Sequence, residues 1–393
     1  MAARVLIALA LLSLVATGTA VEAQPMDYEV WVVDQADAAN GGDRLYIYAP
    51  SSWNQPAEVV QLGATAASVG DGAGVRPHLL LFNNAHTHAL LANVASGHVY
   101  VIRASDRTVV ASIDVGEQAH GAMASPDDRW ILVANQNGKK LARVQADFAS
   151  EQFTHDRAAD LDLGALEDGT HPDNAPICPV MYVGNAGKAY VTLRGGGMYV
   201  VDTLATPMQI LRSYGNDQIA PAGCGGIAHD GRVYVNSGTA NGGNLYVFNA
   251  ETDDLVTSMS TTQYGTDAHG MTIVGNRYLW MANRGVGDNI VVFDTQTGQV
   301  VGTIDDVGPA PDLLGLSPAG DTVFATLRGP KALTGGPSAI GETPGIAILA
   351  VERDGAAGRR IAFVPIGDQG SESNVDPHGI AVRRLQVDSS MSH

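Results

Sequence analysis

The chain is poor in cysteine, in charged residues and in the short motifs of common cofactor sites. Its 393 residues include 2 cysteines, and charged residues make up 16% of the chain. It has no Cys-x-x-Cys-His site, no glycine-rich phosphate-binding loop and no Gly-x-Ser-x-Gly elbow. We therefore expect neither haem nor a nucleotide as a cofactor.

Basic residues are scarce as well. There are 23 Lys and Arg residues against 41 Asp and Glu residues, which gives a formal net charge of −18. A strongly negative protein repels nucleic-acid phosphates and anionic membrane surfaces. Neither is expected as a partner, and the charge favours a soluble protein that attracts cations.

The chain has one marked apolar run, Val5–Val15, which follows a basic residue and is followed by small residues. This order is typical of a secretory signal peptide, and the run is short for a membrane span. We expect Met1–Ala23 to be a signal peptide, with a retained membrane anchor as the alternative. The mature protein is then periplasmic or secreted, with no membrane insertion.

The two cysteines are Cys178 and Cys224. In an oxidising compartment, a single pair of cysteines suggests one disulfide. We therefore predict a Cys178–Cys224 disulfide.

The stretch Ala268–Gly308 contains four short apolar runs separated by turn residues. The runs are Gly270–Val274, Tyr278–Ala282, Asn289–Phe293 and Gln299–Ile304. Runs of this length, rich in Val, Ile, Tyr and Trp and bounded by Gly, Asn and Asp, predict strands. Four strands in about 40 residues make an antiparallel meander, which needs copies of itself to bury both faces.

Copies of this meander recur along the chain. The end of each fourth strand is marked by a glycine, and the marks are spaced by about 43 to 59 residues. They are Gly63, Gly116, Gly164, Gly215, Gly265, Gly308 and Gly367. This period predicts an all-β, seven-bladed β-propeller of four-stranded blades.

The first blade lacks its first strand at the N-terminus, and Pro377–Val382 matches that strand. We expect this C-terminal strand to complete the N-terminal blade and to close the ring, which removes free sheet edges. One propeller domain should span residues 28–385, and residues 386–393 should form a frayed tail.

The repeated runs Tyr199–Asp202, Leu245–Phe248 and Ile290–Phe293 resemble those of the YVTN-repeat propellers, a large bacterial family of seven-bladed proteins. The resemblance covers nearly the whole chain after residue 28. It implies the fold and little about function, because propellers host unrelated activities. Closed propellers are often monomers, and we expect a monomer.

Each first strand begins with a residue type that can bind a metal. In chain order these residues are His78, His120, Cys178, Cys224, His269, Asp312 and His378. The first strand of a blade is innermost, so these side chains should surround one mouth of the central channel. The long segments of the chain fall on the same face, which usually marks the binding face.

Five of these positions occupy consecutive blades: His269, Asp312, His378, His78 and His120. Three or four imidazoles with one carboxylate suit Zn²⁺ or Cu²⁺, whereas free thiolates would favour Cu(I) or Zn²⁺. The alternative is that these histidines are structural and bond neighbouring loop carbonyls, since a His before Gly at this place is common in YVTN-type repeats.

The predicted layout is similar to that of the propellers of nitrous oxide reductase and thiocyanate dehydrogenase, where inward histidines hold copper at a channel mouth. Periplasmic zinc-chaperone propellers are another parallel. This chain differs from the first two by its cysteines and its fewer histidines, and it lacks the His-rich N-terminal tail of the zinc chaperones. No catalytic residue is therefore carried over.

Four basic residues are expected near the same mouth: Arg194, Arg284, Arg328 and Lys139. They could bind a small anionic substrate beside a metal, or they could pair with loop carboxylates.

Three functions follow from these patterns. The first is a secreted metal-binding propeller, either a metal carrier or a copper oxidoreductase. The second is a metal-free scaffold that recognises a protein partner or a glycan through its long loops. The third is a lactonase-like hydrolase, for which Glu342, Glu372 and Asp376 lie in suitable loops.

Overall fold

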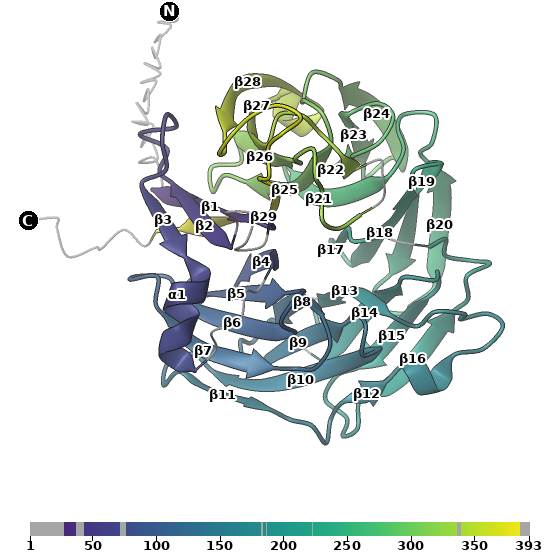
Figure 1. Cartoon of the computed structure of the whole chain (residues 1–393). Coiled ribbons are helices and arrows are strands. Elements are labelled where there is room, and N and C mark those ends of the chain that lie inside the picture. Colours follow the sequence, from purple (N-terminus) through teal and green to yellow (C-terminus); the bar gives the residue numbers. More distant parts are fainter. Residues whose placement is uncertain are drawn as a thin grey trace, which may run out of the picture.

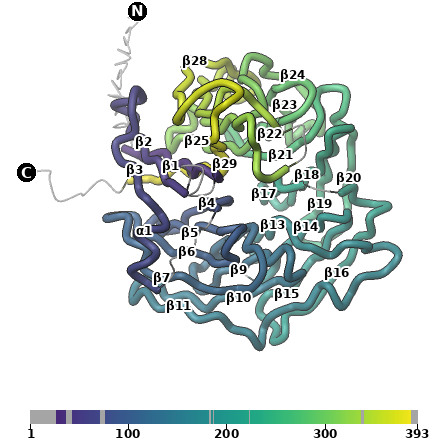
Figure 2. Tube along the Cα trace, viewed as in Figure 1, coloured from purple at the N-terminus to yellow at the C-terminus, as the bar shows by residue number. Residues whose placement is uncertain are grey.

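Seven antiparallel sheets stand like blades around a central axis (Figure 1). The computed structural model describes residues 27–36, 43–70, 76–181, 184–185, 187–221, 223–335 and 339–385. The trace in Figure 2 passes from blade to blade in chain order. The predicted seven-bladed β-propeller is confirmed, while the expected signal peptide and the tail after residue 385 lie outside the described residues.

The strands of blades 1 to 3 follow one another from the channel outward. Blade 1 consists of β29 (Pro377–Arg384), β1 (Tyr28–Asp34), β2 (Arg44–Tyr48) and β3 (Glu58–Gln61). Blade 2 consists of β4 (Pro77–Phe82), β5 (His88–Asn93), β6 (His98–Arg103) and β7 (Val109–Asp114). Blade 3 consists of β8 (Ala119–Ala124), β9 (Trp130–Asn135), β10 (Lys140–Asp147), β11 (Gln152–His155) and β12 (Leu161–Asp162).

Blades 4 to 7 have the same order. Blade 4 consists of β13 (Pro176–Met181), β14 (Lys188–Leu193), β15 (Met198–Asp202) and β16 (Gln209–Tyr214), and blade 5 of β17 (Gly226–His229), β18 (Arg232–Thr239), β19 (Gly242–Asn249) and β20 (Leu255–Ser260). Blade 6 consists of β21 (Ala268–Val274), β22 (Tyr278–Asn283), β23 (Asn289–Asp294) and β24 (Gln299–Ile304), and blade 7 of β25 (Pro311–Leu316), β26 (Thr322–Leu327), β27 (Gly345–Glu352) and β28 (Ala357–Pro365).

In the part of the chain that the structure describes, the helical elements are short turns in the connections. They are α1 (Leu62–Ala66), η2 (Ala67–Val69), η3 (Gly164–Leu166) and η5 (Arg353–Gly355). The pair α1 and η2 joins blade 1 to blade 2 and packs beside β7 (Figure 1). Neither this helical connection nor the division of the outer position of blade 3 between β11 and β12 was predicted from the sequence.

Strand β22 explains why these runs form sheets that are buried on both faces. Successive side chains of a strand point to opposite faces. Leu279 and Met281 pack into the cluster shared with blade 5, whereas Trp280 and Ala282 pack into the cluster shared with blade 7. A strand between two neighbouring blades therefore reads as a continuous apolar run.

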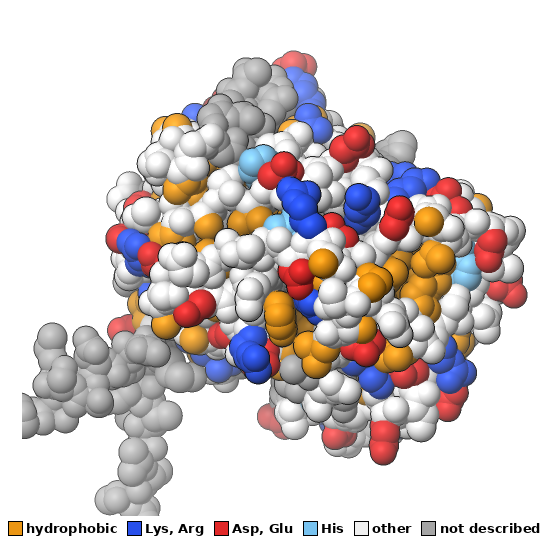
Figure 3. All heavy atoms as spheres, turned by 90° about the horizontal axis from the view of Figure 1, so that it is seen from below, with side chains coloured by type: hydrophobic (Ala, Val, Ile, Leu, Met, Phe, Trp, Pro, Cys, Tyr) orange, Lys and Arg blue, Asp and Glu red, His pale blue; other side chains and the backbone are white. Residues whose placement is uncertain are grey.

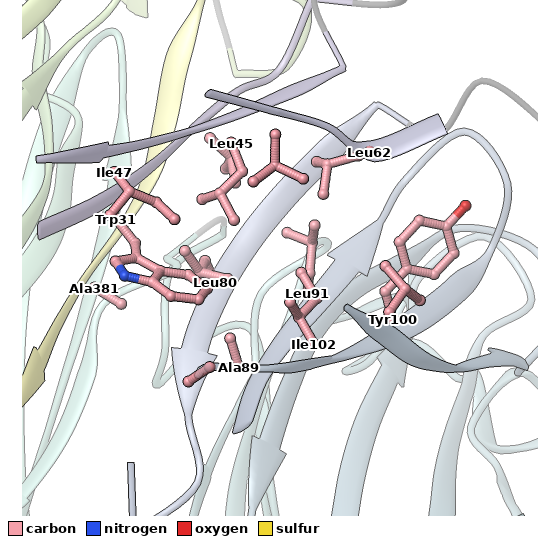
Figure 4. Packing of buried hydrophobic residues seen from close by; sticks show 14 of the residues in the cluster. Trp31, Leu45, Ile47, Leu62, Leu80, Ala89, Leu91, Tyr100, Ile102 and Ala381 are labelled. Atoms are coloured by element: carbon pink, nitrogen blue, oxygen red, sulfur yellow. The ribbon is translucent and has the colours of Figure 1, made fainter. Parts of the chain in front are cut away.

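Among the described residues, seven large hydrophobic clusters lie one between each pair of neighbouring blades, and an eighth, small cluster contains Ile177 and the two cysteines. In the cluster between blades 1 and 2, Trp31 and Leu45 face Leu80, Leu91 and Ile102 (Figure 4). Because every blade needs an apolar neighbour on both sides, the ring must be closed.

The C-terminal strand closes the ring as predicted. Strand β29 pairs antiparallel with β1, with Trp31 opposite Ala381. Backbone hydrogen bonds extend this pairing of β1 with β29, the seam of blade 1, at both ends. They run from Gln35 N to the carbonyl of Asp376 (2.8 Å) and from Leu385 N to the carbonyl of Asp27 (3.0 Å).

The side of the propeller mixes charge types. In Figure 3, acidic and basic side chains lie among small apolar patches. Within the described residues, no helix has the length and apolar character that a membrane span requires.

Removing the closing strand tests the seam. A chain that stops at Asp376 leaves β1 unpaired on its inner side and exposes two clusters, so its Tm should fall by about 10 °C or more. Differential scanning calorimetry measures the change, and a chain that stops at Leu385 and keeps β29 is the control. Equal melting of the two proteins would contradict closure by β29.

Candidate functional site

The seven predicted ring residues lie at the starts of the innermost strands. His78, His120, His269, Asp312 and His378 are each the second residue of their strand. Cys178 is the third residue of β13, and Cys224 lies two residues before β17. All seven side chains are buried. The alignment of the repeats therefore places them correctly around the channel.

A glycine after the ring residue lets neighbouring blades approach closely. A Cβ at Gly225, Gly270 or Gly379 would overlap the carbonyl oxygen of the ring residue in the next blade, respectively His269, Asp312 and His78. Only glycine fits such a contact between backbones. Packing thus explains the glycines that follow His269 and His378 but not Gly121, where a Cβ would lie 3.5 Å from the carbonyl oxygen of Ile177. The histidines themselves need a separate explanation.

The ring residues form the base of a cavity of about 610 Å³. All four ring histidines and Cys224 line it, together with the tight turn between β18 and β19 (Thr239–Asn241) and part of the long connection between β26 and β27 (Leu333–Gly335). The expectation that long loops surround the ring is met by the connection between β26 and β27, whereas the stretch 237–243, which the sequence suggested as a long segment, is mostly strand.

Asp312 links two of the histidines. Its Oδ2 lies 2.5 Å from His378 Nδ1, and its Oδ1 lies 2.5 Å from His269 Nδ1, although the latter contact is poorly directed for a hydrogen bond. A carboxylate at Nδ1 fixes the orientation of the imidazole and keeps the proton on Nδ1, so that Nε2 has a free lone pair. Nε2 of His378 is buried and has no hydrogen-bond partner among the described residues.

The other two histidines belong to a directed chain of hydrogen bonds. Gln35 Oε1 accepts from Arg328 (3.1 Å) and from Thr334 (2.7 Å), so the Gln35 amide NH₂ faces and donates to His78 Nδ1. His78 must then carry its proton on Nε2, which donates to His120 Nε2 at 3.0 Å.

His120 ends this chain. Its Nδ1 lies 2.9 Å from the carbonyl oxygen of Ile177 and therefore carries the proton. Three histidines, His120, His269 and His378, thus hold Nδ1 against an oxygen atom.

Burial lowers the pKa of all four imidazoles, and neighbouring positive groups lower it further. The pKa of His120 falls to about 3 and that of His269 to about 4, while the pKa values of His78 and His378 are lowered as well. Burial acts to raise the pKa of Asp312, but its contacts with His378 and His269 and the positive charges of Arg284 and Arg328 outweigh this effect and hold the pKa well below the usual range. At neutral pH the site therefore holds neutral imidazoles and an ionised carboxylate.

The five residues of the predicted His/Asp set do not form a finished metal cage. Among the described residues, no three of them bring one ligand atom each within 4.8 Å of one another. One group meets that spacing, a ring nitrogen of His120 with the sulfur atoms of Cys178 and Cys224. These two cysteines are joined in the predicted disulfide.

The four predicted basic residues are all paired with carboxylates. Arg194 contacts Asp173 (2.6 Å), Arg284 contacts Asp267 (2.9 Å), and Lys139 contacts both Glu167 and Asp173. Arg328 is fully buried and contacts Asp312 (3.0 Å) and Asp376 (2.6 Å). The structure thus provides the carboxylate partners that the alternative interpretation requires, and anion binding stays a prediction.

The candidate acid–base residues of a lactonase lie outside the cavity. Asp376 is held by the guanidinium group of Arg328, while Glu342 and Glu372 are exposed, and none of the three carboxylates lines the cavity. Gln35 was not predicted from the sequence. It lies in a segment that reads as a loop, and no pattern there indicates that its amide contacts a ring histidine.

Arg328 should contribute more to the free energy of unfolding than an exposed arginine does. Arg328→Met would leave Asp312 and Asp376 buried without their cation, and should lower the free energy of unfolding by about 3–5 kcal/mol. Arg359→Ala, which removes an exposed pair with Glu352, is the control and should cost less than about 1 kcal/mol. Equal losses in urea unfolding would contradict a central role for Arg328.

The neutral imidazoles should make the metal-free protein sensitive to acid. Below pH 6.5 the imidazoles of His120 and His269 are protonated in the unfolded chain, whereas they stay neutral in the folded protein. The free energy of unfolding should therefore decrease as the pH falls from 6.5 to about 4. The slope is at most about 1.4 kcal/mol per pH unit for each imidazole.

The comparison of wild type with His269→Gln isolates this effect. Asp34 acts in the opposite direction, because burial raises its pKa to about 6 and its contribution is lost as pH rises from 3.8 to 6. The difference between the two proteins cancels Asp34. Urea unfolding at several pH values should give a smaller slope for the variant, and parallel curves would refute the assignment.

Comparisons with known proteins support the fold. No protein-family model matches the chain, and no curated protein matches it. Three of the solved structures that are similar to the chain each have a TM-score of 0.62. A putative 6-phosphogluconolactonase from Bacteroides fragilis is 12% identical and covers 94% of this chain and 100% of its own. A functionally unknown protein from Desulfotomaculum acetoxidans is 9% identical, and a protein from Lactobacillus plantarum is 12% identical; each covers 92% of this chain and 100% of its own. At these identities the likeness shows the propeller fold alone.

Proposed function

We propose that this propeller binds one transition-metal cation, Zn²⁺ or Cu²⁺, at the channel mouth through Nε2 of His120, His269 and His378. The observation that carries the proposal is the arrangement of Nδ1 in these three residues, each against an oxygen of Ile177 or Asp312. Metal-binding histidines commonly anchor their second nitrogen in this way.

The protonation state supports the same interpretation. Metal binding requires neutral imidazole, and burial keeps these rings neutral at neutral pH. The buried Nε2 of His378 has no partner among the described residues, and a buried nitrogen of this kind calls for a water molecule or an ion.

The local charge also favours a cation. Three carboxylates, Asp267, Asp312 and Asp376, face two guanidinium groups, Arg284 and Arg328. One negative charge remains in a setting of low dielectric constant, where its attraction for a cation is stronger than in water.

Binding requires small movements of side chains. The three rings must converge to ligand spacing, and His120 must exchange its hydrogen bond from His78 for a bond to the metal. Both changes are rotations within a cavity of about 610 Å³, which has room for them. The open volume would also admit a small substrate or a transferred ligand, so the site suits either a metal carrier or a copper oxidoreductase.

A lactonase activity, which the name of the similar Bacteroides fragilis protein suggests, has less support in this chain. Glu342, Glu372 and Asp376 do not line the cavity. The disulfide is consistent with an oxidising compartment, and we propose a periplasmic or secreted location.

Elemental analysis of untagged protein, together with calorimetric titration of Zn²⁺ and Cu²⁺, tests the proposal. Wild type should bind about one equivalent, because three histidines and one open position make one site. The variant His120→Ala, His269→Ala, His378→Ala should lose it.

A matched triple variant, His86→Ala, His155→Ala, His229→Ala, removes three histidines away from the cavity and should keep the metal. If wild type takes up neither metal, or if both variants behave alike, the proposal is wrong. The first outcome would direct attention to partners of the long loops.

A further inference from the structure

One cysteine of the disulfide, Cys224, lines the same cavity as the histidines. Cys178 belongs to blade 4 and Cys224 to blade 5, on the side of the channel away from Asp312. Cys224 lines the mouth cavity, and both cysteines line a second cavity of about 110 Å³ farther along the channel. The disulfide is therefore placed where a small molecule that enters the mouth can reach it.

The position is unusual for a bond that serves only as a staple. Blades 4 and 5 already share a buried cluster in which Val180 and Tyr190 meet Val233, Val235 and Phe248. The chain has no other cysteines, so the other blade interfaces hold without a disulfide. Packing of blade 4 against blade 5 thus does not depend on the disulfide.

A third ligand is already in place beside the sulfur atoms. A ring nitrogen of His120 and both Sγ atoms lie within 4.8 Å of one another. The bond from His120 Nδ1 to the carbonyl of Ile177, the residue before Cys178, holds the imidazole in this position. Two sulfurs and one imidazole are the donor set of a Cys₂His metal site with one open position.

We infer that the disulfide is a redox switch for a second ligand set, in which the reduced Cys178 and Cys224 bind a thiophilic cation, Zn²⁺ or Cu⁺, together with His120. A small dithiol supplies two electrons and two protons and becomes a disulfide itself. The Cys178–Cys224 bond breaks, each sulfur takes one proton, and those protons leave when the thiolates bind the cation. Thiolates select such soft cations.

The inference depends on the proposed function only through the shared His120. A small dithiol is the appropriate reductant because both cysteines are more than nine-tenths buried, at 6% and 9% exposure, which excludes the bulky active site of a protein oxidoreductase. Reduction would therefore change the cavity from a site with imidazole ligands to one that also offers sulfur.

Anaerobic titration with Zn²⁺ and with Co²⁺, after reduction by dithiothreitol and desalting, tests the inference. Reduced wild type should bind one equivalent more tightly than the oxidised protein, and Co²⁺ should give the intense thiolate charge-transfer band. Cys178→Ser, Cys224→Ser should show neither the band nor any dependence on reduction. His120→Ala should keep two thiols but weaken binding by about tenfold or more.

His269→Ala, His378→Ala separates the two proposals, because it removes the imidazole site and should retain the thiolate band. Metal bound by the oxidised protein alone would support the proposed function and overturn this inference. Metal bound by the reduced protein alone would support this inference and overturn the proposed function. A Cys178–Cys224 disulfide that resists reduction by dithiothreitol in the folded protein would also overturn it. So would unfolding on reduction in the presence of Zn²⁺, because the bond would then be a staple.

Discussion

The buried carboxylate of Asp312 is the interaction on which the polar centre of this molecule depends. It is fully buried and contacts His269, His378 and Arg328. Arg328 in turn holds Asp376 and orients Gln35, and Gln35 sets the tautomer of His78. One ionised group thus determines the orientation of side chains from several blades, because each polar atom there must find a partner away from water.

The sequence predicts the frame of this site well. Apolar runs at a regular period determine the blades, and the first strand determines which residue of each blade faces the channel. Alignment alone therefore placed His78 and His378, although they are 300 residues apart in the chain, on neighbouring strands. The cysteine pair followed from chemistry and from the adjacency of their blades.

The details of the contacts could not be predicted in the same way. A repeat fixes where a Cα atom lies but leaves the side-chain rotamer open, and ligand spacing depends on rotamers. Arg328 shows the difference. By position it belongs to the rim, yet its guanidinium group is fully buried between two carboxylates. Gln35 shows it too, since an isolated amide carries no pattern that a repeat could reveal.

The seam of blade 1 has a consequence for how the protein matures. His378 and Asp376 come from the last residues of the domain, whereas Gln35 comes from the first, and all three meet at the same mouth. A nascent chain that still lacks its final strand has blades but no complete set of ligands. The site is therefore assembled last, and a chain clipped near either end would be produced without it.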